Sequence, residues 1–127
     1  MDNGQLRIKA NPIRDKSFTF ALRVVKLAKL LTREEKEYVL SRQILRSGTA
    51  IGALVRESEH AESKADFIHK MSIALKEANE TSYWLELLHQ AGFIDEHSFQ
   101  SIGHDSEELI KLLIAIVKTA KLAKRSE

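Results

Sequence analysis

Apolar residues recur every three or four positions along most of this chain, which is the pattern of amphipathic helices. In the first helix they form one face that includes Phe18, Phe20 and Val24, and the opposite face is polar. Either Asp15 or Ser17 is expected to cap its start. The predicted helices cover residues 16–31, 34–61, 63–91 and 105–125, with a short helical piece at 95–102 before the last.

Local signals predict where these helices begin and end. A capping box that starts at Thr32 is expected to open the second helix, and a looser one at Ser63 the third. Gly92 is expected to end the third helix in a left-handed conformation, because glycine has no Cβ to clash there. Asp95 is the expected cap of the short piece, and Gly103 is expected to break the chain before the last helix.

Four long helices with short connections predict an all-α fold, an antiparallel up-and-down four-helix bundle. The 127 residues suffice for one domain, so we expect a flexible N-terminal tail at residues 1–14 and a single bundle at 15–127. Cysteine is absent, which excludes disulfides and thiolate chemistry. The first residues lack the apolar segment of a secretion signal, and no apolar run is long enough to span a bilayer. We therefore expect a cytoplasmic protein without a membrane partner.

The overall charge of +2 conceals a strong asymmetry along the chain. Residues 1–33 carry a net charge of +6, residues 34–110 carry −8, and residues 111–127 carry +4. The polar faces of the first and last helices are basic and free of acid. If these helices lie side by side, their lysines and arginines could bind a nucleic-acid backbone, although such faces are often only solvated. The candidate contacts are Arg23, Lys26, Lys29, Lys118 and Lys121.

Gly48 and Gly52 lie one turn apart inside the second helix, where each costs about 0.5–1 kcal/mol relative to alanine. A helix that accepts this cost usually approaches something closely, so we interpret the pair as a helix-packing or subunit contact. Glu77, Glu80 and Trp84 share a face of the third helix. We expect them to serve a helix contact or an interface, with the carboxylates bonded to the backbone or to basic partners. Arginines available on the second helix are Arg42, Arg46 and Arg56.

The residues give little support to the hypothesis that the protein is an enzyme. Three acidic residues precede a histidine by three positions, as in di-iron bundles, at Glu57, Asp66 and Glu86. The first helix has no carboxylate within 16–31, and the last has none between Glu108 and Glu127, so two walls of a di-iron site would lack ligands. No glycine-rich phosphate loop or nucleophile signature occurs. We therefore expect no catalytic residues, no metal and no cofactor.

The central segment resembles the small four-helix-bundle proteins encoded in intervening sequences of bacterial 23S rRNA genes. The matching stretches are Arg46-Ser-Gly-Thr-Ala-Ile51, Ser63-Lys-Ala-Asp-Phe-Ile-His69 and Ile73-Ala-Leu-Lys-Glu77 through Trp84. The resemblance implies a bundle that assembles into a homopentameric ring. A more distant similarity is to the accessory variability determinant of diversity-generating retroelements, a pentameric bundle that binds nucleic acid and a reverse transcriptase. Some relatives carry Asn where this chain has Leu54.

Apolar residues outside the expected bundle seam agree with self-association, because exposed apolar patches usually mark contacts. They are Leu22, Leu30, Ile114 and Leu122. Basic and acidic faces on one subunit would suit a head-to-tail contact, which closes into a ring when the rotation permits. We therefore expect a non-enzymatic, ring-forming bundle that binds structured RNA or DNA backbone. The alternative is a homo-oligomeric scaffold that docks a protein partner and binds no nucleic acid.

Overall fold

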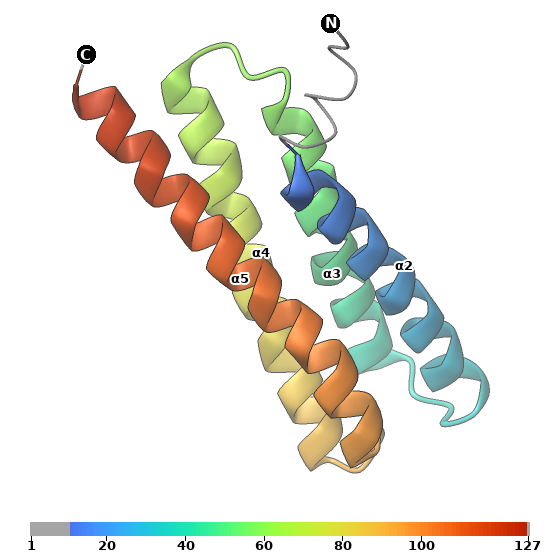
Figure 1. Cartoon of the computed structure of the whole chain (residues 1–127). Helices are drawn as coiled ribbons and strands as arrows, with labels where there is room; N and C mark the ends of the chain where they lie inside the picture. Colours follow the sequence, from blue (N-terminus) through green and yellow to red (C-terminus); the bar gives the residue numbers. More distant parts are fainter. Residues whose placement is uncertain (1–10, 127) are drawn as a thin grey trace, which may run out of the picture.

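The structure is a computed structural model that describes residues 11–126 (Figure 1). This range holds four α-helices and no strand. They are α2 (Pro12–Arg33), α3 (Val39–Ser58), α4 (Lys64–Gln90) and α5 (Glu96–Arg125). None of the helices in the described range has the length and apolar character needed to cross a membrane. The predicted all-α four-helix fold is confirmed.

Successive helices run in opposite directions, and each packs along the next one in the chain (Figure 1). The contact between the first and last helices is much smaller than the three contacts between consecutive helices. Its polar part joins Lys16 to Glu108, and Arg23 to both Asp105 and Ser101. Helix α5 continues well beyond this crossing toward its C-terminal end (Figure 1), where Leu112 and Ala123 line a hollow together with Pro12 at the start of α2.

A continuous apolar core runs between the four helices. Phe20, Val24 and Leu31 supply it from α2, while Leu109 and Leu113 supply it from α5; all five are almost fully buried. Burying a side chain of this size stabilises the fold by about 1.5–3 kcal/mol. The remaining buried positions follow the helical repeat, as the sequence pattern predicted.

Two predicted caps and one predicted helix end are confirmed. The Ser63 hydroxyl accepts a hydrogen bond from the amide of Asp66 at 3.0 Å, which begins α4. The Asp95 carboxylate accepts one from the amide of Ser98 at 2.7 Å, and this bond lowers the pKa of Asp95. Gly92 has φ of 86°, where a residue with a side chain would be strained.

The start of α2 differs from the prediction. The helix begins at Pro12, after Asn11, instead of near residue 16 behind Asp15 or Ser17. Proline suits this first position because its missing N–H would have no helical partner there. Residues 12–14 are therefore helical instead of part of a tail. Residues 1–10 of the expected tail lie outside the described range.

The predicted capping box at Thr32 was wrong. Thr32 lies inside α2, and its hydroxyl donates to the backbone carbonyl of Lys29 at 3.0 Å. Helix α3 begins at Val39, five residues later than residue 34. There the Glu37 carboxylate accepts hydrogen bonds from three successive amides, those of residues 39–41. A carboxylate at this end also suits the helix dipole.

The predicted break at Gly103 was also wrong, because α5 is a single helix of 30 residues. Ile102, Ser106 and Leu109 are buried on the same face of this helix. The burial of that face outweighs the roughly 1 kcal/mol that glycine costs in a helix interior. The second and third helices also stay separate, since α3 ends at Ser58 and α4 begins at Lys64.

Some apolar side chains lie outside the core. Phe18, which was predicted to belong to the core face of the first helix, is 52% exposed. Ala123, near the end of the last helix, is exposed as well, although its spacing from Leu109, Leu113 and Val117 predicts a core position. Four other apolar residues that fell outside the predicted seam are about half exposed: Leu22, Leu30, Ile114 and Leu122.

Candidate nucleic-acid interface and helix contacts

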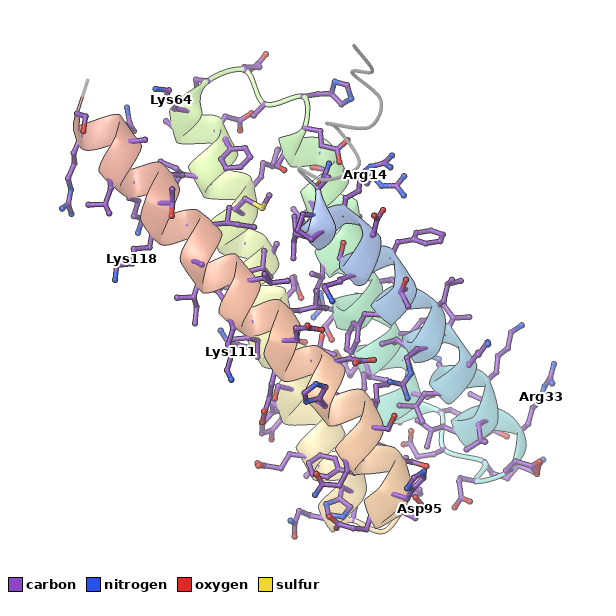
Figure 2. The ribbon with its side chains drawn as sticks, viewed as in Figure 1. Arg14, Arg33, Lys64, Asp95, Lys111 and Lys118 are labelled. Carbon is purple, nitrogen blue, oxygen red and sulfur yellow. The ribbon has the colours of Figure 1, made fainter. Side chains whose placement is uncertain are left out.

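The C-terminal half of α5 carries five exposed cations. We call Lys111, Lys118, Lys121, Lys124 and Arg125 the α5 basic segment. None of them forms an ion pair or a side-chain hydrogen bond within residues 11–126. The chain has no acidic residue between Glu108 and Glu127, so their charge is not neutralised along the helix either. Figure 2 shows Lys111 and Lys118 pointing into the solvent on the same side of α5.

The structure does not bring the five candidate nucleic-acid contacts together. Arg23 is engaged at the α2–α5 crossing, where its Nη1 lies 2.5 Å from Asp105 Oδ2. Lys26 and Lys29 are exposed toward the C-terminal end of α2. Because Lys16 and Glu108 are level in two antiparallel helices, Lys26 and Lys118 lie about 30 Å apart along the bundle. In Figure 2, Arg33 of α2 and Lys118 of α5 point to opposite sides.

The basic residues of the two helices therefore form separate surfaces. On α5, Lys118 and Lys121 belong to a larger run of unpaired cations. On α2, Lys26 and Lys29 are separated from that run, and Arg23 is held by an acid. Of the two surfaces, the α5 basic segment is the stronger candidate for binding phosphates, since each unpaired cation can neutralise one phosphate.

Gly48 of α3 lies directly against Val24 of α2. A Cβ atom at this position would stand only 2.8 Å from both γ carbons of Val24, which is fully buried. Gly52 lies one turn further along α3, where a Cβ would stand 3.4 Å from the backbone oxygen of Ser17. The first glycine therefore allows a close approach of two helices, and the second makes an ordinary contact.

Glu77 and Glu80 of α4 are held by one arginine of α3, Arg46. Its Nη1 lies 3.2 Å from Glu77 Oε1, and its Nη2 bonds to Glu80 Oε2. The same Glu80 oxygen accepts a hydrogen bond from the indole nitrogen of Trp84 at 3.0 Å. The three residues of α4 thus form an ordered cluster against α3.

This cluster shifts two pKa values. The indole of Trp84, followed by the guanidinium of Arg46, lowers the pKa of Glu80 below its ordinary value of 4.5. Hydrogen bonds from Arg46 to Glu80 and Glu77 raise the pKa of the arginine. Next to the cluster, the hydroxyls of Thr81 and Ser47 hydrogen-bond at 2.9 Å in the buried α3–α4 contact. Charged and neutral polar bonds therefore fix the register of these two helices together.

Replacing Glu80 with glutamine is expected to lower the melting temperature near pH 7 by roughly 2 °C, because one exposed ion pair contributes about 0–1 kcal/mol. A carboxylate with a depressed native pKa stabilises the fold above its unfolded pKa and loses that effect as the pH falls through the native value. The difference between wild type and E80Q should therefore shrink as the pH falls below the ordinary carboxyl pKa of 4.5, and vanish only below the lowered pKa of native Glu80. Thermal melts at several pH values, followed by fluorescence of the single tryptophan, measure it.

Glu86 provides the control, because it is exposed on the same helix and its side chain makes no hydrogen bond or ion pair within residues 11–126. The variant E86Q should melt like wild type at every pH. A difference between wild type and E80Q that stays constant from pH 7 to pH 3 would show that the charge of Glu80 is not what stabilises the contact.

The three acid-x-x-His pairs take part in other contacts. Glu57 pairs with Lys70 at 3.6 Å, and the Asp66 carboxylate accepts a hydrogen bond from the backbone of Glu62. His89 bonds to Glu96 at 2.9 Å, not to Glu86, and its ring stacks on Phe99 with centroids 4.2 Å apart. Throughout residues 11–126, no group of three or more His, Asp or Glu side chains is placed to hold a metal ion.

These features define a class of protein: an antiparallel four-helix bundle with tightly joined α3 and α4 and a long, basic last helix. The chain belongs to the 23S rRNA-intervening sequence protein family, whose model matches residues 9–115. The resemblance inferred from the central segment is therefore confirmed. No match to the chain was found among curated proteins.

A solved structure with the same fold is a protein of unknown function from the S23 ribosomal protein family of Bacteroides thetaiotaomicron VPI-5482. The two chains are 58% identical, and the match covers 84% of this chain and 98% of the other. The TM-score of 0.83 indicates closely similar helix arrangements.

Proposed function

We propose that this protein is a non-enzymatic, ring-forming four-helix bundle that binds the phosphate backbone of structured RNA or DNA. The observation that carries the proposal is the α5 basic segment, with five exposed cations and no acid among them. Lysines and arginines of this kind bind phosphates by releasing counterions, largely without reading sequence. No aromatic residue lies between these cations, so the proposed contact is with the backbone and not with stacked bases.

Self-association is supported by exposed apolar residues on α5 and on α2. Ile114 and Leu122 are half exposed on α5, as are Leu22 and Leu30 on α2. A ring would cover such residues and repeat the α5 basic segment around one assembly. Repeated binding sites raise the overall affinity for a long ligand without any new contact.

The relatives guide the choice of ligand. The family is described by its association with 23S rRNA genes, and the solved neighbour carries a ribosomal family name. Structured RNA is therefore the first nucleic acid to test, and duplex DNA of equal length is the second. A helical RNA offers a continuous phosphate backbone to an exposed basic helix.

Binding of a fluorescein-labelled 20-base-pair RNA hairpin is expected to weaken steeply with salt. If all five cations contact phosphates, the log–log slope should approach about −4.5, by the rule of roughly −0.9 per contact on duplex DNA. The affinity would then fall by a few hundredfold between about 50 and 200 mM salt. Fluorescence anisotropy measures the slope directly.

The absence of binding at 10 µM protein in 50 mM salt would contradict the nucleic-acid part of the proposal. Light scattering after size exclusion tests the assembly part separately. A pentamer of 14.4 kDa chains would have a mass of about 72 kDa, whereas a mass of one chain would contradict ring formation.

A further inference from the structure

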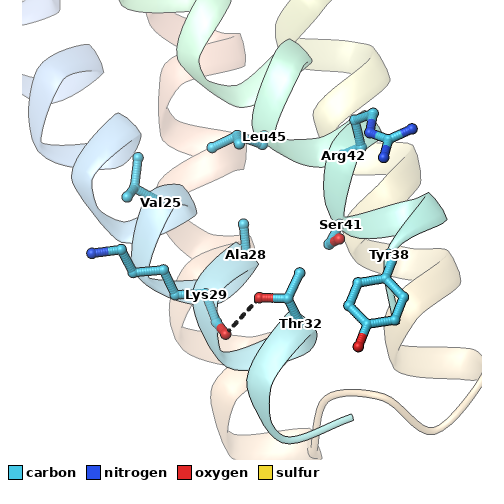
Figure 3. Close-up of a pocket in the computed structure, with 8 residues that line it drawn as sticks. All are labelled: Val25, Ala28, Lys29, Thr32, Tyr38, Ser41, Arg42 and Leu45. Atoms are coloured by element: carbon cyan, nitrogen blue, oxygen red, sulfur yellow. Dashed lines mark hydrogen bonds between the residues drawn. The ribbon is translucent and has the colours of Figure 1, made fainter. Parts of the chain in front are cut away.

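Two hollows lie on the outer surface where α2 packs against α3, and together we call them the α2/α3 groove. The first has a volume of about 330 Å³ and lies toward the turn between the two helices (Figure 3). The second has a volume of about 260 Å³ and lies toward the start of α2. The first is lined by Val25, Ala28, Lys29, Thr32, Tyr38, Ser41, Arg42 and Leu45, and the second by Arg14, Ser17, Phe18, Ala21, Thr49, Gly52, Ala53 and Arg56.

The two hollows are adjacent, because their lining residues lie one helical turn apart on both α2 and α3. On α2, Ala21 of one hollow precedes Val25 of the other by one turn, and on α3 Leu45 precedes Thr49 by one turn. The lining of α2 extends from Arg14 to Thr32, which corresponds to about 27 Å of helix. A groove of this length matches a helix of about 18 residues, or five turns.

The charged residues of the groove are all basic. Four cations line it, and neither hollow contains an acid. Lys29 and Arg42 have no ion pair within the described residues, and Figure 3 shows them on opposite sides of the first hollow. Arg56 lies over the ring of Phe18, 5.4 Å from its centroid, while Arg14 pairs with Glu59. The groove therefore has a positive rim that the chain neutralises only at Arg14.

Between these cations the surface is apolar. Phe18 of α2 and Leu45 of α3 are exposed, and the two hollows are also lined by Ala21 and Val25 of α2. In Figure 3, Val25 and Leu45 lie on facing helices with the hollow between them. A phosphate backbone would gain nothing from this apolar floor, whereas the apolar face of an amphipathic helix would bury it. The groove chemistry thus favours a peptide over a nucleic acid.

The exposed helix faces of the chain itself do not complement this groove. On α5, Ile114 and Leu122 are exposed among the lysines of the α5 basic segment, which the positive rim would repel. On α4, the exposed Tyr83 lies one turn from Glu86, but Lys76 lies two turns before it on the same face. A second copy of this chain therefore offers no described helix that is both acidic and apolar.

We propose that the α2/α3 groove binds an acidic amphipathic helix of a partner protein. Its apolar side chains, spaced at i, i+3 and i+7, would cover Phe18, Val25 and Leu45. Its carboxylates would face Lys29, Arg42 and Arg56, and would set the orientation of the helix in the groove. This surface is separate from the α5 basic segment, so it could bind a protein while α5 binds nucleic acid.

The test uses the full chain and a labelled, amidated 18-residue peptide with leucine at i, i+3, i+7, i+10 and i+14 and alternating glutamate and alanine elsewhere. Fluorescence anisotropy should show saturable binding with a micromolar Kd. A peptide of the same composition with the leucines scrambled should bind at least about tenfold more weakly, because it cannot present one apolar face. Equal binding of both peptides, or no binding at 100 µM protein, would overturn the proposal.

Variants locate the site. R42E and L45Q should each raise the Kd about tenfold, since one reverses a rim charge and the other makes the floor polar. K76E changes an exposed lysine of α4 by the same charge as R42E and should leave the Kd unchanged. Circular dichroism confirms that each variant folds.

Light scattering of these variants and competition with RNA test two other occupants of the groove. If R42E and L45Q dissociate the free protein in light scattering, a second copy occupies the groove and the proposal fails. It also fails if a 20-base-pair RNA displaces the peptide competitively, because the groove would then be a nucleic-acid site.

Discussion

Replacing Gly48 with alanine is expected to destabilise the folded protein by about 1–2 kcal/mol. The added methyl group would stand 2.8 Å from two carbons of Val24, whose branched side chain has little freedom to move away. Overpacking of this kind costs about 1–3 kcal/mol, and the better helix propensity of alanine returns up to about 1 kcal/mol. The melting temperature should fall by roughly 5 °C in a thermal melt.

Gly52 provides the matched control, because a methyl group there would make an ordinary contact with Ser17. The variant G52A is expected to be as stable as wild type or up to about 1 kcal/mol more stable. The double variant G48A/V24A tests the stated cause. Removal of the Val24 methyl groups should make the double variant more stable than the sum of the two single changes implies. Strictly additive effects would show that Val24 is not what excludes a side chain at position 48.

Reversing the charge of Lys118 and Lys121 together is expected to weaken the binding of the 20-base-pair RNA hairpin at least about tenfold at 100 mM salt. The log–log salt slope should become shallower by about 1 for each lysine that contacts a phosphate. Both residues are exposed and unpaired, so the exchange to glutamate should leave the fold intact. Anisotropy titrations at three salt concentrations measure both quantities.

Two further double variants separate a local contact from the effect of net charge. K36E/K76E changes the net charge equally but lies on the α2–α3 turn and on α4, so it should reduce affinity much less. K26E/K29E tests the exposed lysines of α2, about 30 Å from Lys118, and is also expected to cost less than the change on α5. If all three variants lose affinity equally, the α5 basic segment is not the binding surface.

The helical architecture was predictable because the apolar repeat directly encodes which faces are buried. Phe20, Val24, Leu109 and Leu113 are all in the core, as their spacing indicated. The caps at Ser63 and Asp95 were predictable for a similar reason, since each acts on an amide only three residues away. Features set by neighbours in the chain can be inferred from the chain alone.

The errors arose where another interaction outweighs a local signal. Thr32 has the sequence of a capping box, yet α2 continues through it, and Glu37 caps α3 instead. Gly103 has the sequence of a break, yet the burial of Ile102 and Ser106 keeps α5 continuous. At Gly103 the deciding energy comes from contacts between helices, which a local pattern does not contain, whereas at Thr32 the competing cap by Glu37 is itself local.

Some features of the candidate sites could be predicted from the sequence, and others depend on how the helices pack. The basic run on the last helix is visible in the sequence, because no acid interrupts it. The ion pair that holds Arg23 is not visible in the sequence, because Asp105 lies 82 positions away along the chain. The α2/α3 groove was missed because Phe18 and Leu45 look like core residues until the position of each helix is known. Two of its rim cations, Arg42 and Arg56, were considered in the sequence only as partners for carboxylates.

The last turns of α5 are exposed on nearly every side, from Lys118 to the end of the helix. Few tertiary contacts hold them, so they can unwind while the rest of the bundle stays intact. Their backbone amides should consequently exchange with deuterium well before those around Leu109. A bound polyanion that bridges the side chains of these turns would tie them together, and slower deuterium uptake there would reveal it in the unaltered protein.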